Sequence, residues 1–183
     1  MNDFSNNFEQ EKIIKNSDSA VMNFVVAPAS DHASGLNLEG LVDYINKKTN
    51  FKINLILCKD YNEAIEALIQ GKAQIGWLGP YAYLEASRSG AIEQFAIGLP
   101  KGKKTTNYQS VFIVRQDSTI TSLEKIKNTR LIIGDHHSTS GYAVPKQVLS
   151  EVGINIDNEN EFKEVIKSNT HDETIRNIIE GRA

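Results

Sequence analysis

The stretch RLIIGDHHSTSGYAVP, residues 130–145, decides the fold, because a strand-like run passes here into a helix-like one. The apolar run ends in an aspartate and two histidines, followed by Ser138, Thr139, Ser140 and Gly141. The first turn of a helix has backbone N–H groups without intrahelical partners, and the helix dipole adds partial positive charge there. Three hydroxyl groups beside those N–H groups favour a site for a tetrahedral oxyanion that is bound by neutral donors.

Helix capping is a simpler interpretation of the same residues, because serine and threonine are common N-caps. Ser138 is the expected N-cap, and one hydroxyl would be enough for that purpose, so the run of three favours anion binding. Pro145 has no N–H to donate to residue 141, so we expect the helix to begin irregularly or to kink. STSG is not a GxSxG elbow and the chain has no GxxxxGK[ST] loop, which argues against a nucleophilic serine and against nucleotide hydrolysis.

The sequence gives no sign of a metal or a cofactor. His136 and His137 are adjacent, and adjacent side chains tend to point in different directions, so we expect no metal site from this pair. The single cysteine, Cys58, excludes an internal disulfide and a multi-cysteine metal cluster, and it is expected to be a buried, inert thiol.

Composition and charge limit the classes of function. Hydrophobic residues make up 40% of the 183 residues and charged residues 23%, which is typical of a soluble globular chain. The formal net charge of -3 gives no basic field for nucleic acid, so no nucleic-acid partner is expected. No apolar stretch approaches the roughly 20 residues that span a bilayer. Residues 1–21 are polar and unlike a secretion signal, and we expect a flexible leader there.

Short β-branched runs alternate with helical patterns along the rest of the chain. This alternation predicts an α/β fold in which largely parallel sheets are flanked by helices. The polar run KGKKTTN interrupts it, so we expect two lobes, residues 22–105 and residues 106–183. The expected strands are residues 22–28, 53–59, 73–79, 93–100, 109–116, 130–135 and 161–168. The expected helices are residues 38–50, 62–71, 81–90, 122–128, 145–153 and 172–181.

A weak internal repeat aligns residues 61–73 with residues 171–183, with five identical positions. The first copy runs directly into a strand, whereas the second stops at Ala183. The pattern therefore lacks a strand in the second lobe, and an unpaired edge of this kind exposes backbone groups. We expect either a fragment of a longer protein, which we favour, or a dimer or strand exchange in which another chain supplies the strand.

Tyr61 and His171 occupy equivalent positions of the repeat, each just before a helix. Ligands of open α/β sheets bind beyond the carboxyl ends of the strands, where such turns gather, and both side chains can donate hydrogen bonds to an anion. Tyr108 opens the second lobe at the mouth of the expected cleft. Tyr81 and Tyr83 follow another strand and are further candidates for the lining of the site.

The run from Tyr108 to Pro145 resembles the substrate-binding components of phosphonate and phosphite ABC transporters. The family signature matches Asp135, Ser138 to Gly141, Tyr142 and Pro145, and the resemblance extends from about Asn23 to Ala183. It implies the two-lobed, type II periplasmic-binding-protein fold, here with an incomplete second lobe. The chain departs from the family in having His136 and His137 where a proline and a small polar residue are common.

The resemblance also implies a function without catalysis. Ser138, Thr139 and Ser140 would hold the phosphonate oxygens, His171 would be a further donor, and Tyr61 and Tyr108 match ligand-contacting tyrosines. An ABC permease would be the membrane partner, and the location would be extracytoplasmic, either periplasmic or lipid-anchored. Family members are longer, and acidic residues that recognise an amine on the ligand would lie in the remainder.

Two alternative functions remain open at this point. The same module could be the sensor domain of a signalling protein. It could also be a cytoplasmic enzyme for a phosphorylated substrate, for which His171 is the one candidate base.

Overall fold

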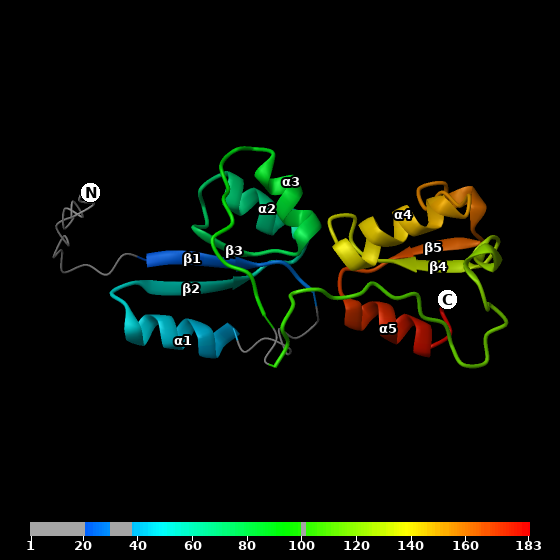
Figure 1. Ribbon diagram of the computed structural model, residues 1–183, viewed down its shortest axis with the longest axis horizontal. Helices are drawn as coiled ribbons and strands as arrows, with labels where there is room; N and C mark the ends of the chain where they lie inside the picture. Colours follow the sequence, from blue (N-terminus) through cyan, green and yellow to red (C-terminus); the bar gives the residue numbers. More distant parts are fainter. Residues whose placement is uncertain (1–20, 30–37, 100–101) are drawn as a thin grey trace, which may run out of the picture.

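The computed structural model describes residues 21–29, 38–99 and 102–183 as two α/β lobes that lie end to end (Figure 1). Lobe one contains β1 (Val21–Val26), α1 (Leu38–Lys48), β2 (Lys52–Leu57), α2 (Tyr61–Ile69), β3 (Ile75–Trp77) and α3 (Pro80–Ser87). Lobe two contains the 3₁₀-helix η1 (Leu123–Ile126), β4 (Arg130–Ile133), the π-helix η2 (Thr139–Ala143), α4 (Val144–Glu151), the 3₁₀-helix η3 (Glu159–Glu161), β5 (Glu164–Lys167) and α5 (His171–Ile179). None of the helices in these ranges is long and apolar enough to cross a membrane.

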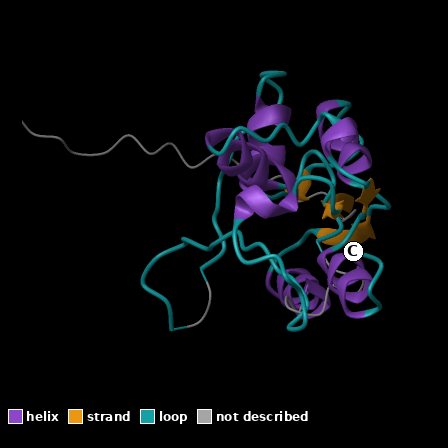
Figure 2. Ribbon diagram, turned by 90° about the vertical axis from the view of Figure 1, so that its right-hand side faces the viewer, coloured by secondary structure: helices purple, strands orange, loops and turns teal. Residues whose placement is uncertain are grey.

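The sheet of lobe one has the strand order β2–β1–β3, and both strand pairs are parallel. Because successive side chains of a strand point to opposite faces, β1 contributes to two hydrophobic cores. Val25 packs with Ala64 of α2 and Ala82 of α3, whereas Phe24 and Val26 pack in the core beside α1. Seen from the lobe-two end, helices therefore lie both above and below the strands (Figure 2).

The sheet of lobe two pairs β4 with β5 in parallel, from Arg130 opposite Glu164 to Ile133 opposite Lys167. Helices α4 and α5 lie on opposite sides of these strands (Figure 1). The most buried side chains of this core are Leu149, Ile154 and Ile156, each at most 1% exposed. The two sheets confirm the prediction of largely parallel strands flanked by helices.

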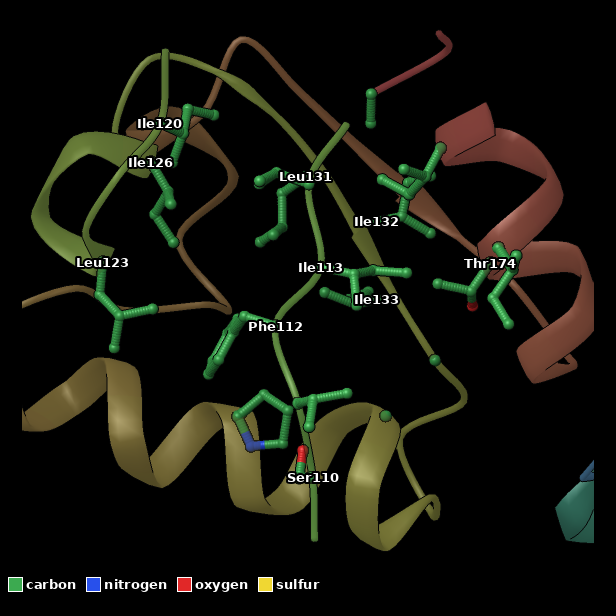
Figure 3. Close-up of a pocket in the computed structure, with 18 of the residues that line it drawn as sticks. Ser110, Phe112, Ile113, Ile120, Leu123, Ile126, Leu131, Ile132, Ile133 and Thr174 are labelled. Atoms are coloured by element: carbon green, nitrogen blue, oxygen red, sulfur yellow. The ribbon is translucent and has the colours of Figure 1, made fainter. Parts of the chain in front are cut away.

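The two lobes repeat the same order of elements, as the internal repeat predicts. In lobe one, α2 leads into β3, which pairs with the second edge of β1. Within the described residues, β4 pairs only with β5, and all four residues of β4 also line a cavity of about 920 Å³. Ile113, Ile133 and Thr174 line this cavity (Figure 3). Ala183 is a further lining residue.

Two predicted strands, residues 93–100 and 109–116, are wrong as far as the structure describes them. Both segments are irregular, because a strand forms only where a neighbouring strand pairs with its backbone groups. Their apolar side chains stay accordingly exposed, for example Phe95 at 81% and Val111 at 69%. The predicted helix at 122–128 is the short 3₁₀-helix η1, which ends before Asn128, whose φ of 60° is left-handed.

The structure does not test the predicted leader or the predicted lobe boundary, but it does describe Cys58. The expected leader falls almost entirely on residues 1–20, outside the described residues. The boundary between residues 105 and 106 stays a prediction. Cys58 is buried as expected, and its burial raises the pKa of the thiol.

Candidate ligand-binding site

Ser138 caps the helix that follows β4. Its side-chain oxygen accepts a hydrogen bond from the Gly141 N–H at 3.1 Å, and its own N–H donates to the Asp135 carbonyl at 2.8 Å. The side chain is only 4% exposed. The prediction that Ser138 is the N-cap is thus confirmed.

The helix begins with a π-turn, and Pro145 explains why. The N–H of Ala143 donates to the Ser138 carbonyl at 3.0 Å, and the Val144 N–H donates to the carbonyl of Thr139, five residues back in each case. Pro145 has no N–H for the Gly141 carbonyl, which accepts instead from the Gly134 N–H at 2.9 Å. The predicted irregular start is confirmed, and π-turns of this kind are frequent at functional sites.

Gly134 and Gly141 allow the end of β4 to pack directly on the start of this helix. A Cβ atom on Gly134 would lie 3.0 Å from the Gly141 Cα, and one on Gly141 would lie 3.1 Å from the Gly134 Cα. The missing side chain at Gly141 therefore allows the helix start to pack closely against the end of β4.

Thr139 connects this turn to lobe one. Its Oγ1 accepts a hydrogen bond from the Tyr81 N–H at 2.9 Å, in the first turn of α3. A hydroxyl group that accepts one bond can still donate its own proton, so the Thr139 O–H is available to an anion. The carbonyl of the next residue, Ser140, accepts from the Ser110 hydroxyl at 2.7 Å, which holds the turn from the other side.

Tyr61 approaches the same turn from lobe one. It is the first residue of α2 and is 6% exposed. Burial raises the pKa of the phenol above 10.0, the nearby Ser138 hydroxyl lowers it, and Asp135 and Tyr108 raise it further. The phenol is therefore neutral at physiological pH and can donate a hydrogen bond. The structure thus places Tyr61 beside Ser138 and near enough to Tyr108 for its charge to affect the Tyr61 pKa, and the role of these residues in ligand binding stays a prediction.

The other predicted residues lie at varying distance from this cluster. His171 begins α5, its N–H donates to the Ala29 carbonyl of lobe one at 3.1 Å, and it lines the lobe-two cavity with Ser140 and Gly141. Tyr81 contributes its backbone N–H to Thr139, while its hydroxyl bonds to Glu85. Tyr83 is half-buried one turn into α3, and its role in the site stays a prediction.

Sequence reasoning missed a second contact between the lobes. The Nδ1 atom of His137 lies 2.5 Å from the Glu85 Oε2 of α3, with both side chains largely buried. Burial alone would raise the pKa of Glu85, but hydrogen bonds from His137 and Tyr81 outweigh it and hold that pKa below 4.5. The four-residue spacing of Tyr81 and Glu85 was a usable sign that they share one helix face. Nothing in the sequence pairs Glu85 with His137.

We expect Glu85→Gln to lower the free energy of unfolding by up to about 1 kcal/mol at neutral pH, because the two side chains are still 13% and 23% exposed and solvent screens part of their interaction. A carboxyl group with a lowered pKa in the folded state stabilises it above the ordinary pKa of 4.5, and this contribution is lost as the pH falls through the lowered value. The free energies of unfolding of the wild type and Glu85→Gln, measured with urea from about pH 3 to about pH 7, should therefore differ at neutral pH and converge in acid. Glu93→Gln, at an exposed carboxylate after α3, is the control, and a difference independent of pH would contradict the assignment.

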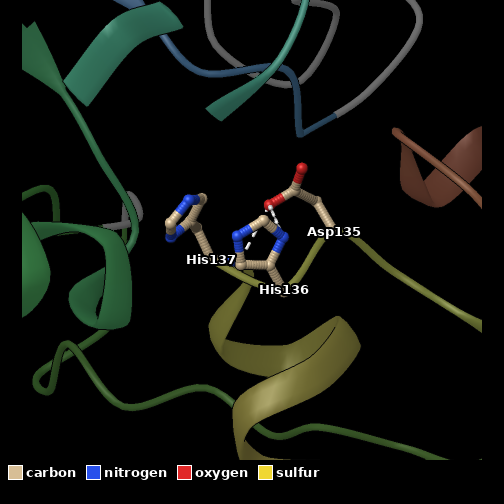
Figure 4. A group of neighbouring side chains, drawn as sticks. All are labelled: Asp135, His136 and His137. Atoms are coloured by element: carbon tan, nitrogen blue, oxygen red, sulfur yellow. Dashed lines mark hydrogen bonds and ion pairs between the residues drawn. The ribbon is translucent and has the colours of Figure 1, made fainter. Parts of the chain in front are cut away.

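The expectation that His136 and His137 point apart is wrong. Their ring centroids lie 3.9 Å apart at an interplanar angle of 40°, beside the Asp135 carboxylate (Figure 4). The turn after β4 causes this, because Asp135 accepts from the His137 N–H at 2.8 Å and curls the backbone back on itself.

A family profile described as "ABC transporter, phosphonate, periplasmic substrate-binding protein" matches residues 24–183. The chain belongs to this family. Among its relatives, the phosphate-import protein PhnD of Mycolicibacterium smegmatis is 28% identical over 116 residues, which is 62% of this chain and 36% of the relative. The phosphonates-binding periplasmic protein of Escherichia coli is 32% identical over 105 residues, 55% of this chain and 31% of the relative. The chain thus spans about a third of the length of these two relatives.

Solved structures place the fold of this family member in the same class. The binding-protein component of a phosphonate ABC transporter from Pseudomonas aeruginosa superposes with a TM-score of 0.72 at 23% identity, over 91% of this chain and 56% of that one. PhnD1 from Prochlorococcus marinus, solved with methylphosphonate, gives a TM-score of 0.66 at 19% identity, over 88% of this chain and 61% of that one. The fold is therefore the predicted type II periplasmic-binding-protein fold.

Proposed function

We propose that this chain is the solute-binding part of an ABC transporter and holds a phosphonate, or a related oxyanion such as phosphite or a phosphate ester, between its two lobes. The observation that carries the proposal is the convergence of both lobes on one helix start. Thr139 accepts a hydrogen bond from the Tyr81 N–H of α3, and Tyr61 of α2 lies close enough to Ser138 for that hydroxyl to lower the Tyr61 pKa. The relatives support the ligand class, because one is named for phosphonates and another was solved with methylphosphonate.

The proposed site binds the anion with neutral groups. The hydroxyls of Ser138, Thr139 and Ser140 and the N–H groups of the first helical turn would donate to its oxygens. Tyr61, which stays protonated, and Tyr108 would donate from the side of lobe one and the lobe junction. His171 at the start of α5 would add a charge-assisted bond when protonated, and such a bond is about twice as strong as a neutral one.

Ligand binding would favour the closed arrangement of the lobes. A ligand shifts such an equilibrium only by contacts that it makes in one state and not in the other, and groups from both lobes meet only on closure. The closed form would present the anion to a membrane permease outside the cytoplasm, without catalysis by this chain. The matched family is one of transport components, which favours this function over a sensor domain or an enzyme.

Thermal unfolding in the presence of phosphate, phosphite, methylphosphonate, 2-aminoethylphosphonate and sulfate tests the proposed function. A ligand at 100 times its Kd stabilises by about 2.7 kcal/mol, or about 5–11 °C in Tm for a chain of this size. We expect such a rise with a phosphorus oxyanion and a smaller one with sulfate. An unchanged Tm with every anion, or the same rise with sulfate as with the phosphorus oxyanions, would contradict the proposal.

The expected dimer or strand exchange stays a prediction. The edge of β4 that borders the cavity is unpaired among the described residues, and the neighbouring Val111, Ile113 and Ile175 expose apolar surface. An unpaired strand edge beside apolar surface is a position at which another strand can pair.

A further inference from the structure

Three side chains of types that bind transition metals converge in the turn after β4 (Figure 4). Asp135, His136 and His137 each offer a ligand atom, and these atoms all lie within 4.8 Å of one another. In a tetrahedral zinc site, bond lengths of about 2.1 Å put the ligand atoms about 3.4 Å apart. Small side-chain rotations would therefore bring the three groups to bonding distance of one ion.

We propose that Asp135, His136 and His137 bind a divalent transition-metal ion, with Zn²⁺ as the best fit. Two imidazoles and one carboxylate suit Zn²⁺, Co²⁺, Ni²⁺ and Cu²⁺, and they are a poor set for Ca²⁺ and Mg²⁺, which take oxygen ligands. Three ligands from the protein leave a fourth tetrahedral position open to water or to an anion oxygen.

Two of the three groups are already held in place. The Asp135 side chain is 12% exposed, and its Oδ1 accepts from the His137 N–H at 2.8 Å and also lies 4.0 Å from the His136 Nδ1. A carboxylate oxygen that accepts one hydrogen bond keeps a second lone pair, which can face an ion. His137 is 13% exposed, and its Nδ1 lies 2.5 Å from Glu85 of lobe one. A carboxylate at one ring nitrogen fixes the ring and leaves Nε2 as the metal ligand, an arrangement common in zinc sites.

The third group supplies the necessary freedom of movement. The His136 side chain is 68% exposed, so its ring can rotate toward the ion without disturbing the core. Asp135 also lies close enough to Tyr61 to affect its pKa. A bound cation would thus stand beside the proposed anion site, where it would offset the negative charge of Asp135.

A Co²⁺ titration of tag-free protein, followed by visible absorption and then by displacement with Zn²⁺, tests this site. We expect one equivalent to bind to the wild type, and His136→Ala and Asp135→Asn each to weaken binding at least about tenfold. His136→Ala should keep the Tm of the metal-free protein, because the side chain is exposed. The readout is metal binding itself, so the result does not depend on whether a phosphonate binds.

The remaining histidines are the controls. The chain has four in all, and His32→Ala and His171→Ala should bind Co²⁺ as the wild type does; His32 lies outside the described residues. No binding by the wild type would overturn the proposal. So would binding that is lost in His32→Ala or His171→Ala and kept in His136→Ala.

Discussion

Thr139→Ala is expected to weaken the binding of a phosphorus oxyanion by about 1–3 kcal/mol, or about 5- to 150-fold in Kd. The change removes the hydroxyl that would donate to the anion, and it leaves the Tyr81 N–H of lobe one without its acceptor at 2.9 Å. The loss therefore affects both the ligand contact and the closed arrangement of the lobes. Calorimetric titration with the anion that raises Tm most gives the measurement.

Thr139→Ser is the matched control for this change. Serine keeps the hydroxyl and removes only a methyl group, so we expect affinity close to that of the wild type. His171→Ala should weaken the binding of the oxyanion about as much as Thr139→Ala does, because it removes another proposed hydrogen-bond donor. Wild-type affinity in Thr139→Ala and His171→Ala would contradict the assignment of the site.

Gly134→Ala is expected to destabilise the protein by about 1–3 kcal/mol, as other overpacked positions do. The new Cβ would lie 3.0 Å from the Gly141 Cα, and both partners are backbone, which cannot rotate away as a side chain can. The end of β4 and the π-turn would have to separate, and the hydrogen bond from the Gly134 N–H to the Gly141 carbonyl would weaken. We expect Tm to fall by about 2–12 °C.

Gly79→Ala is the control for that substitution. Its Cβ would meet only the Thr139 Oγ1, at 3.4 Å, which is ordinary contact with a side-chain atom. Urea or thermal unfolding of the two variants side by side gives the comparison. Equal stability of Gly134→Ala and the wild type would show that the close packing of strand and turn is not required.

The sequence predicted those parts of the fold that depend on local pattern. Apolar spacing located α2 and α5, and the repeat between them placed Tyr61 and His171 at equivalent positions, where each begins its helix. Residues 109–116 have the composition of a strand but remain irregular, because strand formation depends on a partner that composition does not reveal.

In the site, too, features set by neighbouring residues were predictable, whereas contacts between distant residues were not. The Ser138 cap and the irregular start caused by Pro145 follow from the chemistry of neighbouring residues, and they were predictable. The pair between His137 and Glu85 joins residues 52 positions apart in the chain, and it arises only when α3 packs against the π-turn. The adjacent histidines were misjudged for a related reason, since the Asp135 turn sets their direction.

The central claim is that the hydroxyl-rich turn after β4 binds a tetrahedral oxyanion. The most direct measurement is a titration of isotope-labelled protein with methylphosphonate, in which the backbone amide resonances are followed by NMR. We predict that the largest shifts fall on Thr139, Ser140 and Gly141, with smaller ones at Tyr61. Saturating binding with its largest shifts elsewhere, or no shifts at these amides, would contradict the claim and leave Ser138 as a helix cap alone.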